Sequence, residues 1–429
     1  MSSGSDSAPD LGTLRKVFWV LGVLGASLTW GRTASDGTVG HLLEILHGSH
    51  ALPGSDTPLL DRFSGIPPLD YLLRTLVVFF WEAIDGSHPD VTATAIYFVG
   101  QLFPIIIAIY LDGLRRANGS SLAGPTIWFF VFGAAAIGAS GAAWALAYTA
   151  ASSLTTSPSA SADDLRRGSL VDSPRAAALL LPATVLGYVV PVILMGLPSP
   201  TVVSDEFRQW SIVLWNTFPL LMLVIVAAAK RVLEATVPPS SSSGSASDNK
   251  PPARAHLRVV RWVAAVSAAV GFALHVAVAT VSVSTALFPA LFNDKHARAI
   301  APRALAAPPL SLPRGDTVGD GIRAFMYWDQ AVGYSLVLLV FLAQLRNALR
   351  AVSVSAPPSG SASASAYERS GRTWTWTWTG LVAASAASSL LLGPGTTVIA
   401  ASWLRDEVLF GQHGGEDERL QQQQPNKRG

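Results

Sequence analysis

The stretch VTATAIYFVGQLFPIIIAIYLDGLRR at residues 91–116 decides the fold class. Residues 91–111 carry no charged side chain, and the run ends at Asp112, Arg115 and Arg116. A helix of about 20 mostly apolar residues crosses the hydrocarbon core of a bilayer. The stretch therefore predicts a membrane-spanning helix at 91–113.

Comparable runs recur along the chain, and charges or helix breakers flank them. The clearest are 124–150, 176–198, 209–229, 262–289, 324–345 and 379–403. The shorter run 15–30 follows a basic start, which fits a cleaved signal sequence or a retained first helix. The many spans downstream favour the retained helix.

The segment 69–84 is the doubtful one, because it is short and contains Arg74 and Glu82. A short embedded helix or a re-entrant segment suits it as well as a full span. We therefore expect an all-α fold, a polytopic transmembrane helical bundle of eight to nine spans. It would form one membrane-embedded domain over residues 1–410. The Lys and Arg totals of alternate loops are nearly equal, so they do not set the orientation.

The composition supports a surface that faces lipid. Half of the 429 residues are hydrophobic and 14% are charged, whereas soluble chains carry roughly a quarter charged residues. The net charge of +2 and the lack of a basic block argue against nucleic-acid binding. With no cysteine, no HExxH and no aspartate-rich pair, we expect neither a metal nor a cofactor.

Three stretches are rich in small and polar residues and predict disordered connectors. They are 151–165, 235–255 and 353–371, and the glutamine-rich tail 411–429 resembles them. The run TWTWTWT at 373–379 is typical of a membrane interface, where tryptophans gather at the headgroup level. No internal repeat is visible, which disfavours a transporter built from duplicated halves.

Charged residues near the ends of spans are the candidates for chemistry, because charge within a bilayer is costly. Asp85 follows the aromatic run Phe79-Phe80-Trp81, and Asp329 lies in FMYWDQAVGY at 325–334. Arg405, Asp406 and Glu407 follow the last span. The plain alternative is that these are helix-end charges and boundary ion pairs. Gln101, Tyr188 and Asn216 lie within spans, so each needs a polar partner inside the bundle.

Six motifs together resemble the fungal multi-pass membrane terpene cyclases of meroterpenoid clusters, the ascofuranone and macrophorin type. They are GIPPLDYLLRTLVVFFWEAIDGSHP (65–89), FVGQ (98–101), LPATVLGYVVPVILMGLPSP (181–200), QWSIVLWNTFPL (209–220), FMYWDQAVGY (325–334) and GPG…WLRDE (393–407). Asp85, Gln101, Asp329, Arg405, Asp406 and Glu407 match recurring positions of that family. Glu82 stands where the family commonly has proline, so no role is carried over to it.

The resemblance implies an enzyme that protonates a terminal epoxide or alkene of a prenylated phenol or polyketide. That start needs a carboxylic acid kept neutral by burial, and aromatic faces to stabilise the cation. We expect Asp85, Asp329 and Asp406 to converge on one aromatic cavity, with one of them, Asp85 first, as the general acid. The substrate contacts would come from Trp81, Gln101, Tyr188, Trp328, Arg405 and Glu407.

Two other classes explain the spans equally well. The first is a transporter or exporter of a small hydrophobic metabolite, and the second is a scaffold for membrane-bound pathway enzymes. The resemblance implies a lipophilic prenylated substrate, residence in the bilayer of the endoplasmic reticulum and contact with other membrane-bound enzymes of the pathway.

Overall fold

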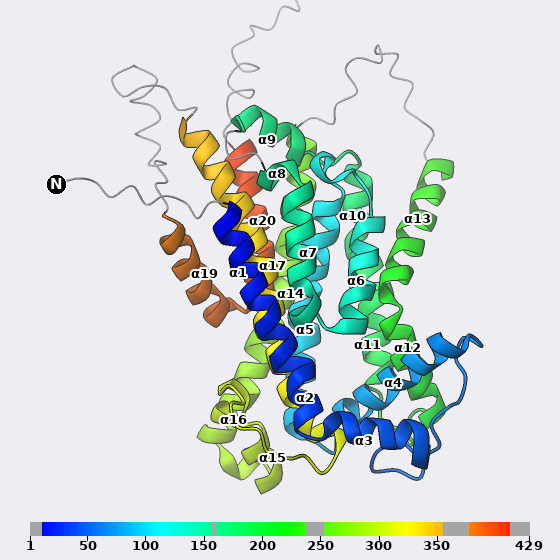
Figure 1. The fold of residues 1–429 in the computed structure, drawn as a ribbon. Helices are drawn as coiled ribbons and strands as arrows, with labels where there is room; N and C mark the ends of the chain where they lie inside the picture. The colour runs from blue at the N-terminus through cyan, green and yellow to red at the C-terminus, as the bar shows by residue number, and fades with distance from the viewer. Residues whose placement is uncertain (1–10, 157–159, 237–252, 355–376, 412–429) are drawn as a thin grey trace, which may run out of the picture.

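Helix α5, Pro89–Gly113, lies at the centre of the bundle (Figure 1). The computed structural model describes residues 11–156, 160–236, 253–354 and 377–411. Proline suits the start of α5, because its missing N–H would be unpaired there in any residue. Every residue from 100 to 113 is buried, and α5 packs against α14 (Ala253–Leu287), α17 (Val318–Val354) and α20 (Pro394–Phe410).

Five helical segments of the described residues are long and apolar enough to cross a membrane. They are Leu11–Ser35, α5, Pro174–Met195, α14 and α17. The first comprises α1 (Leu11–Ala26), η1 (Ser27–Gly31) and α2 (Arg32–Ser35), and the third α10 (Pro174–Thr184), η4 (Val185–Val189) and α11 (Val190–Met195). Helices α12 (Asp205–Asn216) and α13 (Phe218–Thr236), bent by 68° at their junction, make a sixth if they count as one span.

This bundle is compatible with an integral membrane protein, and large apolar side chains such as Trp19, Val20 and Leu390 are exposed on its outside. The predicted eight to nine spans are not confirmed. The difference comes from three of the predicted spans, 124–150, 379–403 and 69–84.

The predicted span 124–150 is two helices, α6 (Ala123–Ala135) and α7 (Ile137–Ala151), joined at Ala136. The chain turns back there, since Asn118, just before α6, donates to Tyr148 Oη near the end of α7 at 2.8 Å. At a rise of about 1.5 Å per residue, each helix is shorter than the roughly 30 Å of hydrocarbon. The segment is a helical hairpin that enters the bundle and returns (Figure 1).

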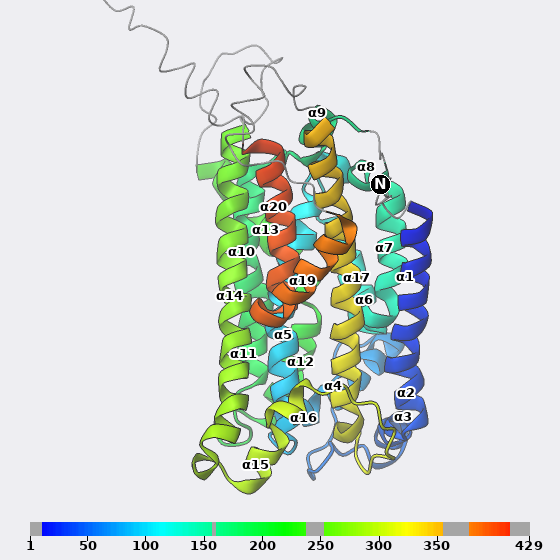
Figure 2. The ribbon, with the colours of Figure 1, turned by 90° about the vertical axis from the view of Figure 1, so that its left-hand side faces the viewer.

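The predicted span 379–403 reverses in the same way, at Gly393 between α19 (Trp378–Leu392) and α20. Both ends of this hairpin meet neighbouring turns of α17. The Arg346 guanidinium lies 5.8 Å from the Trp378 ring centroid, and Arg405 donates to Gln344. Figure 2 shows α19 lying against α20 on the outside of the bundle.

The segment 69–84 lies within α4, Pro67–Ile84, which does not qualify as a span. With α4, the same end of the bundle carries α3 (Thr38–Glu44), η2 (Ile45–Ser49), η5 (Pro289–Leu291), α15 (Asp294–Ala299) and α16 (Pro302–Ala306) (Figure 1). The opposite end carries η3 (Arg116–Asn118), α8 (Ser153–Thr156) and α9 (Ala162–Ser169).

Connector 151–165 was expected to be disordered, but α8 lies within it and α9 begins in it. Ser161 caps α9 by accepting a hydrogen bond from Asp164 N at 3.2 Å, and small polar residues of this kind suit caps as well as linkers. Connectors 235–255 and 353–371 and the tail 411–429 lie almost wholly outside the described residues.

Candidate active site

The turn between α6 and α7 lies inside the bundle, against α17. Ala136, at φ 69° and ψ 141°, ends α6 and starts α7. Gly138 N at the start of α7 donates to Asp329 Oδ1 at 2.6 Å. Across the turn, Trp30 Nε1 donates to Ala135 O at 2.8 Å. Side chains of two other segments therefore pair backbone groups that lipid would leave unsatisfied.

Glycines let this turn approach its neighbours closely. A Cβ on Gly25 of α1 would lie 2.0 Å from Gly138 O, and a Cβ on Gly333 of α17 would lie 2.5 Å from Ile137 Cγ2. Contacts between small residues allow helix backbones to pack at this distance. The packing fixes the start of α7 against α17 and so fixes the position of Asp329.

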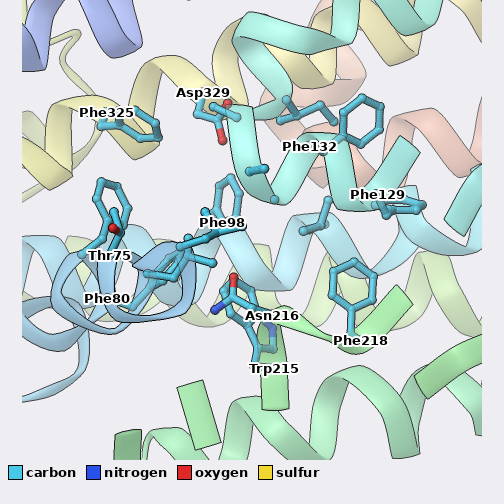
Figure 3. A pocket seen from close by; sticks show the side chains of 18 of the residues that line it. Thr75, Phe80, Phe98, Phe129, Phe132, Trp215, Asn216, Phe218, Phe325 and Asp329 are labelled. Carbon is cyan, nitrogen blue, oxygen red and sulfur yellow. The ribbon is translucent and has the colours of Figure 1, made fainter. Parts of the chain in front are cut away.

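A pocket opens beside the turn, and among the residues that the structure describes Asp329 is the one ionisable residue that lines it (Figure 3). The other polar lining residues are Thr75 and Asn216. The aromatic lining residues come from seven segments and are Trp30, Phe79, Phe80, Phe98, Phe129, Phe132, Trp215, Phe218 and Phe325. The pocket is thus an aromatic chamber with a single acid.

The aromatic rings support one another in a chain of edge-to-face contacts. Ring centroids lie 5.0 Å apart for Trp30 and Phe325, 5.0 Å for Phe325 and Phe79, and 5.1 Å for Phe79 and Phe80. Phe80 continues the chain to Trp215 at 4.9 Å. Such contacts hold rings in fixed orientations, and ring faces carry the partial negative charge that attracts cations.

Asp329 is 5% exposed, and no Lys, Arg or His of the described chain lies within 4.0 Å of its carboxyl group. Its Oδ1 is committed to Gly138 N. An ionised carboxylate without a cation is unfavourable in apolar surroundings, whereas a neutral carboxyl can donate a hydrogen bond or a proton. The site is chemically suited to an acid.

Asp406 and Arg405 belong to a different site, a buried ion network that joins α5 to α20. Arg115 Nη2 lies 2.7 Å from Asp406 Oδ2, and Arg405 Nη1 lies 2.9 Å from Asp112 Oδ1. Arg115 Nε also lies 2.9 Å from Asp112 Oδ1. The two guanidinium groups balance the two carboxylates, so the charges of Asp406 and Arg405 stabilise the packing of α20.

Asp85 is partly buried at the C-terminal end of α4. Its Oδ1 accepts hydrogen bonds from Ser87 N at 2.8 Å and Ser87 Oγ at 2.6 Å. It does not line the pocket. The expected convergence of Asp85, Asp329 and Asp406 on one cavity is therefore wrong. The sequence places all three near span ends, but α17 begins at Val318, so Asp329 lies well inside its helix.

Gln101 and Tyr188 are buried in the interior, as predicted. Gln101 Nε2 donates to Gly271 O at 2.8 Å, and Gly395 N donates to Gln101 Oε1 at 3.0 Å. Tyr188 Oη donates to Val99 O at 2.9 Å. These bonds hold helices together, and neither side chain lines the pocket.

The remaining predicted substrate contacts also lie off the pocket lining. Trp81 stacks under Arg208, whose guanidinium carbon is 5.2 Å from the ring centroid. Glu407 pairs with Arg261 at 2.6 Å, and Trp328 is partly buried on α17. Glu82 caps α17 by accepting from Gly319 N at 2.6 Å, which explains why a buried acid is tolerated there.

Most of the pocket lining lies outside the predicted site residues. Trp30, Phe129, Phe132 and Phe218 were read as ordinary residues of apolar spans. One available signal was the aromatic cluster at 128–132 followed directly by the small residues of 133–143, a change of side-chain size within one apolar run. Asn216 stands out in the sequence as a polar residue within a span, but its place across the pocket from the acid follows only from the fold.

Comparison with known proteins identifies relatives. The model of the CtvD domain family matches residues 14–410. The chain is 27% identical to terpene cyclase ascI of Acremonium egyptiacum over 46% of this chain and 50% of that protein. It is 28% identical to terpene cyclase ctvD of Aspergillus terreus, over 47% and 55%. It is 27% identical to terpene cyclase verU1 of Penicillium polonicum, over 78% and 83%.

The matching region spans about half the length of the first two of these curated relatives. No solved structure matches the chain.

Proposed function

Because the chain belongs to the CtvD domain family, we propose that it is a terpene cyclase that works within a membrane. Asp329 is the general acid of this proposal. The substrate is a prenylated phenol or polyketide that carries a terminal epoxide or alkene. Relatives named terpene cyclases support the reaction class, and the pocket supports the residue.

The observation that carries the proposal is one buried acid in an aromatic chamber. Asp329 is buried without a basic partner in the described chain, and nine aromatic residues line the same pocket. Protonation of an alkene or epoxide needs an acid beside the reacting atoms. The resulting cation needs ring faces and the exclusion of water.

The proposed chemistry begins with proton transfer from Asp329 to the epoxide oxygen. The bond from that oxygen to the more substituted carbon breaks, leaving a hydroxyl group and a tertiary cation. The next double bond attacks the cationic carbon, and each new carbon–carbon bond moves the positive charge along the chain. Loss of a proton from the last cation forms an alkene and restores the carboxyl group. The reaction is an isomerisation that needs one proton in and one proton out.

Asp329 also has a structural role, because it accepts the hydrogen bond from Gly138 N. The two roles use different parts of the carboxyl group. The cap needs an acceptor at Oδ1, whereas the chemistry needs a proton. An amide at this position would keep the first and lose the second.

A lipid-dissolved prenyl chain is the substrate class that an apolar bundle of this kind suits. The described part of the chain has five helices long enough to cross a membrane, which is compatible with substrate entry from the bilayer. We place the enzyme in the endoplasmic reticulum on the resemblance to membrane cyclases.

The test is turnover in microsomes whose only added protein is this chain. The probe is a synthetic phenol that carries a farnesyl chain with a terminal epoxide. We expect a cyclised isomer of unchanged mass, identified by chromatography and NMR. Accumulation of unchanged probe inside the vesicles would support an exporter instead, and unchanged probe on both sides would contradict both activities.

A further inference from the structure

Asn216 faces Asp329 across the pocket, and nothing in the proposed chemistry uses it. It is the last residue of α12, where the chain bends by 68° into α13. Figure 3 shows its amide oxygen directed toward the space below the Asp329 carboxyl group. The bend places a polar side chain in an otherwise aromatic wall, between Trp215 and Phe218.

A hydrogen bond to the backbone fixes which way the Asn216 amide faces. Its Nδ2 donates to Ile212 O, one turn earlier in α12, at 2.8 Å. A carbonyl oxygen can only accept, so the nitrogen must face Ile212 and the amide oxygen must face away from it. Asn216 therefore presents an acceptor, Oδ1, to the pocket.

The other polar groups of the lining do not use this acceptor. Thr75 Oγ1 donates to Tyr71 O in its own helix at 2.8 Å. The hydrogen bonds of the described residues include none to Asn216 Oδ1. A polar atom that loses its water to an apolar ligand without gaining a donor is costly. The pocket thus calls for a ligand with a hydrogen-bond donor at this end.

We propose that Asn216 Oδ1 accepts a hydrogen bond from a hydroxyl group on the substrate's phenolic or enolic head. This inference rests on the proposed cyclase function and adds a binding direction to it. The head lies at the junction of α12 and α13, and the terminal epoxide or alkene of the prenyl chain lies at Asp329. Asn216 is a positioning residue that selects hydroxylated heads.

Two probes and two enzymes test the contact in microsomes. The probes are the farnesyl-phenol epoxide and the same molecule with hydrogen in place of the phenolic hydroxyl. The wild-type enzyme should have a kcat/KM roughly tenfold or more higher for the phenol, mainly through KM, as expected for one buried hydrogen bond. Asn216→Leu keeps the branched shape of the side chain but has no acceptor, so it should give the same kcat/KM for the two probes.

The outcomes separate this inference from the proposed function. If the wild-type enzyme cyclises both probes with equal kcat/KM, the head-group contact is wrong while the cyclase function stands. If Asn216→Leu keeps the wild-type preference for the phenol, the contact is again wrong. If the wild-type enzyme cyclises neither probe, the cyclase function and the contact both fall. The comparison of probes on the wild-type enzyme decides the matter even if Asn216→Leu does not accumulate.

Discussion

Two helical hairpins, α6–α7 and α19–α20, turn back part-way along the bundle, and a polar side chain from a neighbouring helix meets each turn. Asp329 meets the first turn and accepts hydrogen bonds from the backbone there, with Gly138 N at 2.6 Å. Gln101 meets the second, where it donates to Gly271 O and accepts from Gly395 N. The Gln101 amide both donates and accepts, whereas the Asp329 carboxyl group only accepts from the turn and lines a pocket.

The backbones of the two turns have similar dihedral angles. The turns therefore differ mainly in the side chain that meets them, Asp329 or Gln101. Ala136 has φ 69° and ψ 141°, and Gly393 has φ 93° and ψ 147°. The same local geometry therefore serves two purposes. At one turn a buried amide joins two helices, and at the other an acid lies beside the aromatic rings of the pocket.

The largest effect that separates the two hairpins is expected from Asp329→Asn. The amide oxygen still accepts from Gly138 N, but the proton for catalysis is gone, so turnover of the epoxide probe should fall by about 10²–10⁴-fold. Thermal stability in detergent should stay close to that of the wild-type protein. The matched control is Asp85→Asn, which lies outside the pocket and should turn over normally. A near-normal rate for Asp329→Asn would place the acid elsewhere.

The reverse exchange, Gln101→Glu, should damage stability. Glutamate cannot donate to Gly271 O when ionised, and it buries a charge beside a carbonyl oxygen. The free energy of unfolding should fall by about 3 kcal/mol, as for a buried group left without its partner. Denaturation of purified protein in detergent measures the change, with Asp329→Asn as the comparison. Equal stability of the two variants would remove the distinction between the hairpins.

Gly395→Ala tests how tightly the second turn is packed. A Cβ there would lie 2.0 Å from Gln101 O and 2.7 Å from Pro104 Cγ, so the backbone of α20 must move. We expect a loss of about 2 kcal/mol in unfolding free energy, within the usual range for overpacking. The control is Gly40→Ala in α3, where a Cβ meets no atom within 4 Å. A harmless Gly395→Ala would mean that α20 docks loosely.

The smallest effect is expected at the first turn, and it has the opposite sign. Ala136 holds a positive φ that L residues rarely adopt, and glycine adopts it without strain. Ala136→Gly should raise the unfolding free energy by about 1 kcal/mol. Ala139→Gly, inside α7, is the control and should lower it by about the same amount. Destabilisation by both variants would show that Ala136 is not strained.

The sequence predicts the helical class and the apolar runs, but only part of the chain path. The Gly-Pro-Gly at 393–395 was a visible signal for a break within a predicted span. The turn at Ala136 has no such signal. Its positive φ is one that glycine usually adopts, but the residue there is an alanine, so the sequence does not indicate a turn. An apolar run of sufficient length predicts burial in lipid, and it does not tell a span from a hairpin.

Asp329 and Asp406 illustrate what the sequence cannot separate. Both are acids near the edge of an apolar run. Arg115, which neutralises Asp406, is 291 positions away in the chain, and the rings around Asp329 come from segments spread over most of its length. The role of each acid depends on these distant partners, and no local pattern records them.

If the bundle inserts into a membrane, the ion network between α5 and α20 affects the cost of insertion. Asp112 and Arg115 lie one helical turn apart, and Arg405 and Asp406 are adjacent, so each segment carries its own neutral pair. Each pair lowers the cost of transferring charge into lipid while its segment is still alone. When α20 packs against α5, each guanidinium group also pairs with the carboxylate of the other segment. These crossed ion pairs set the axial register of the α19–α20 hairpin against α5.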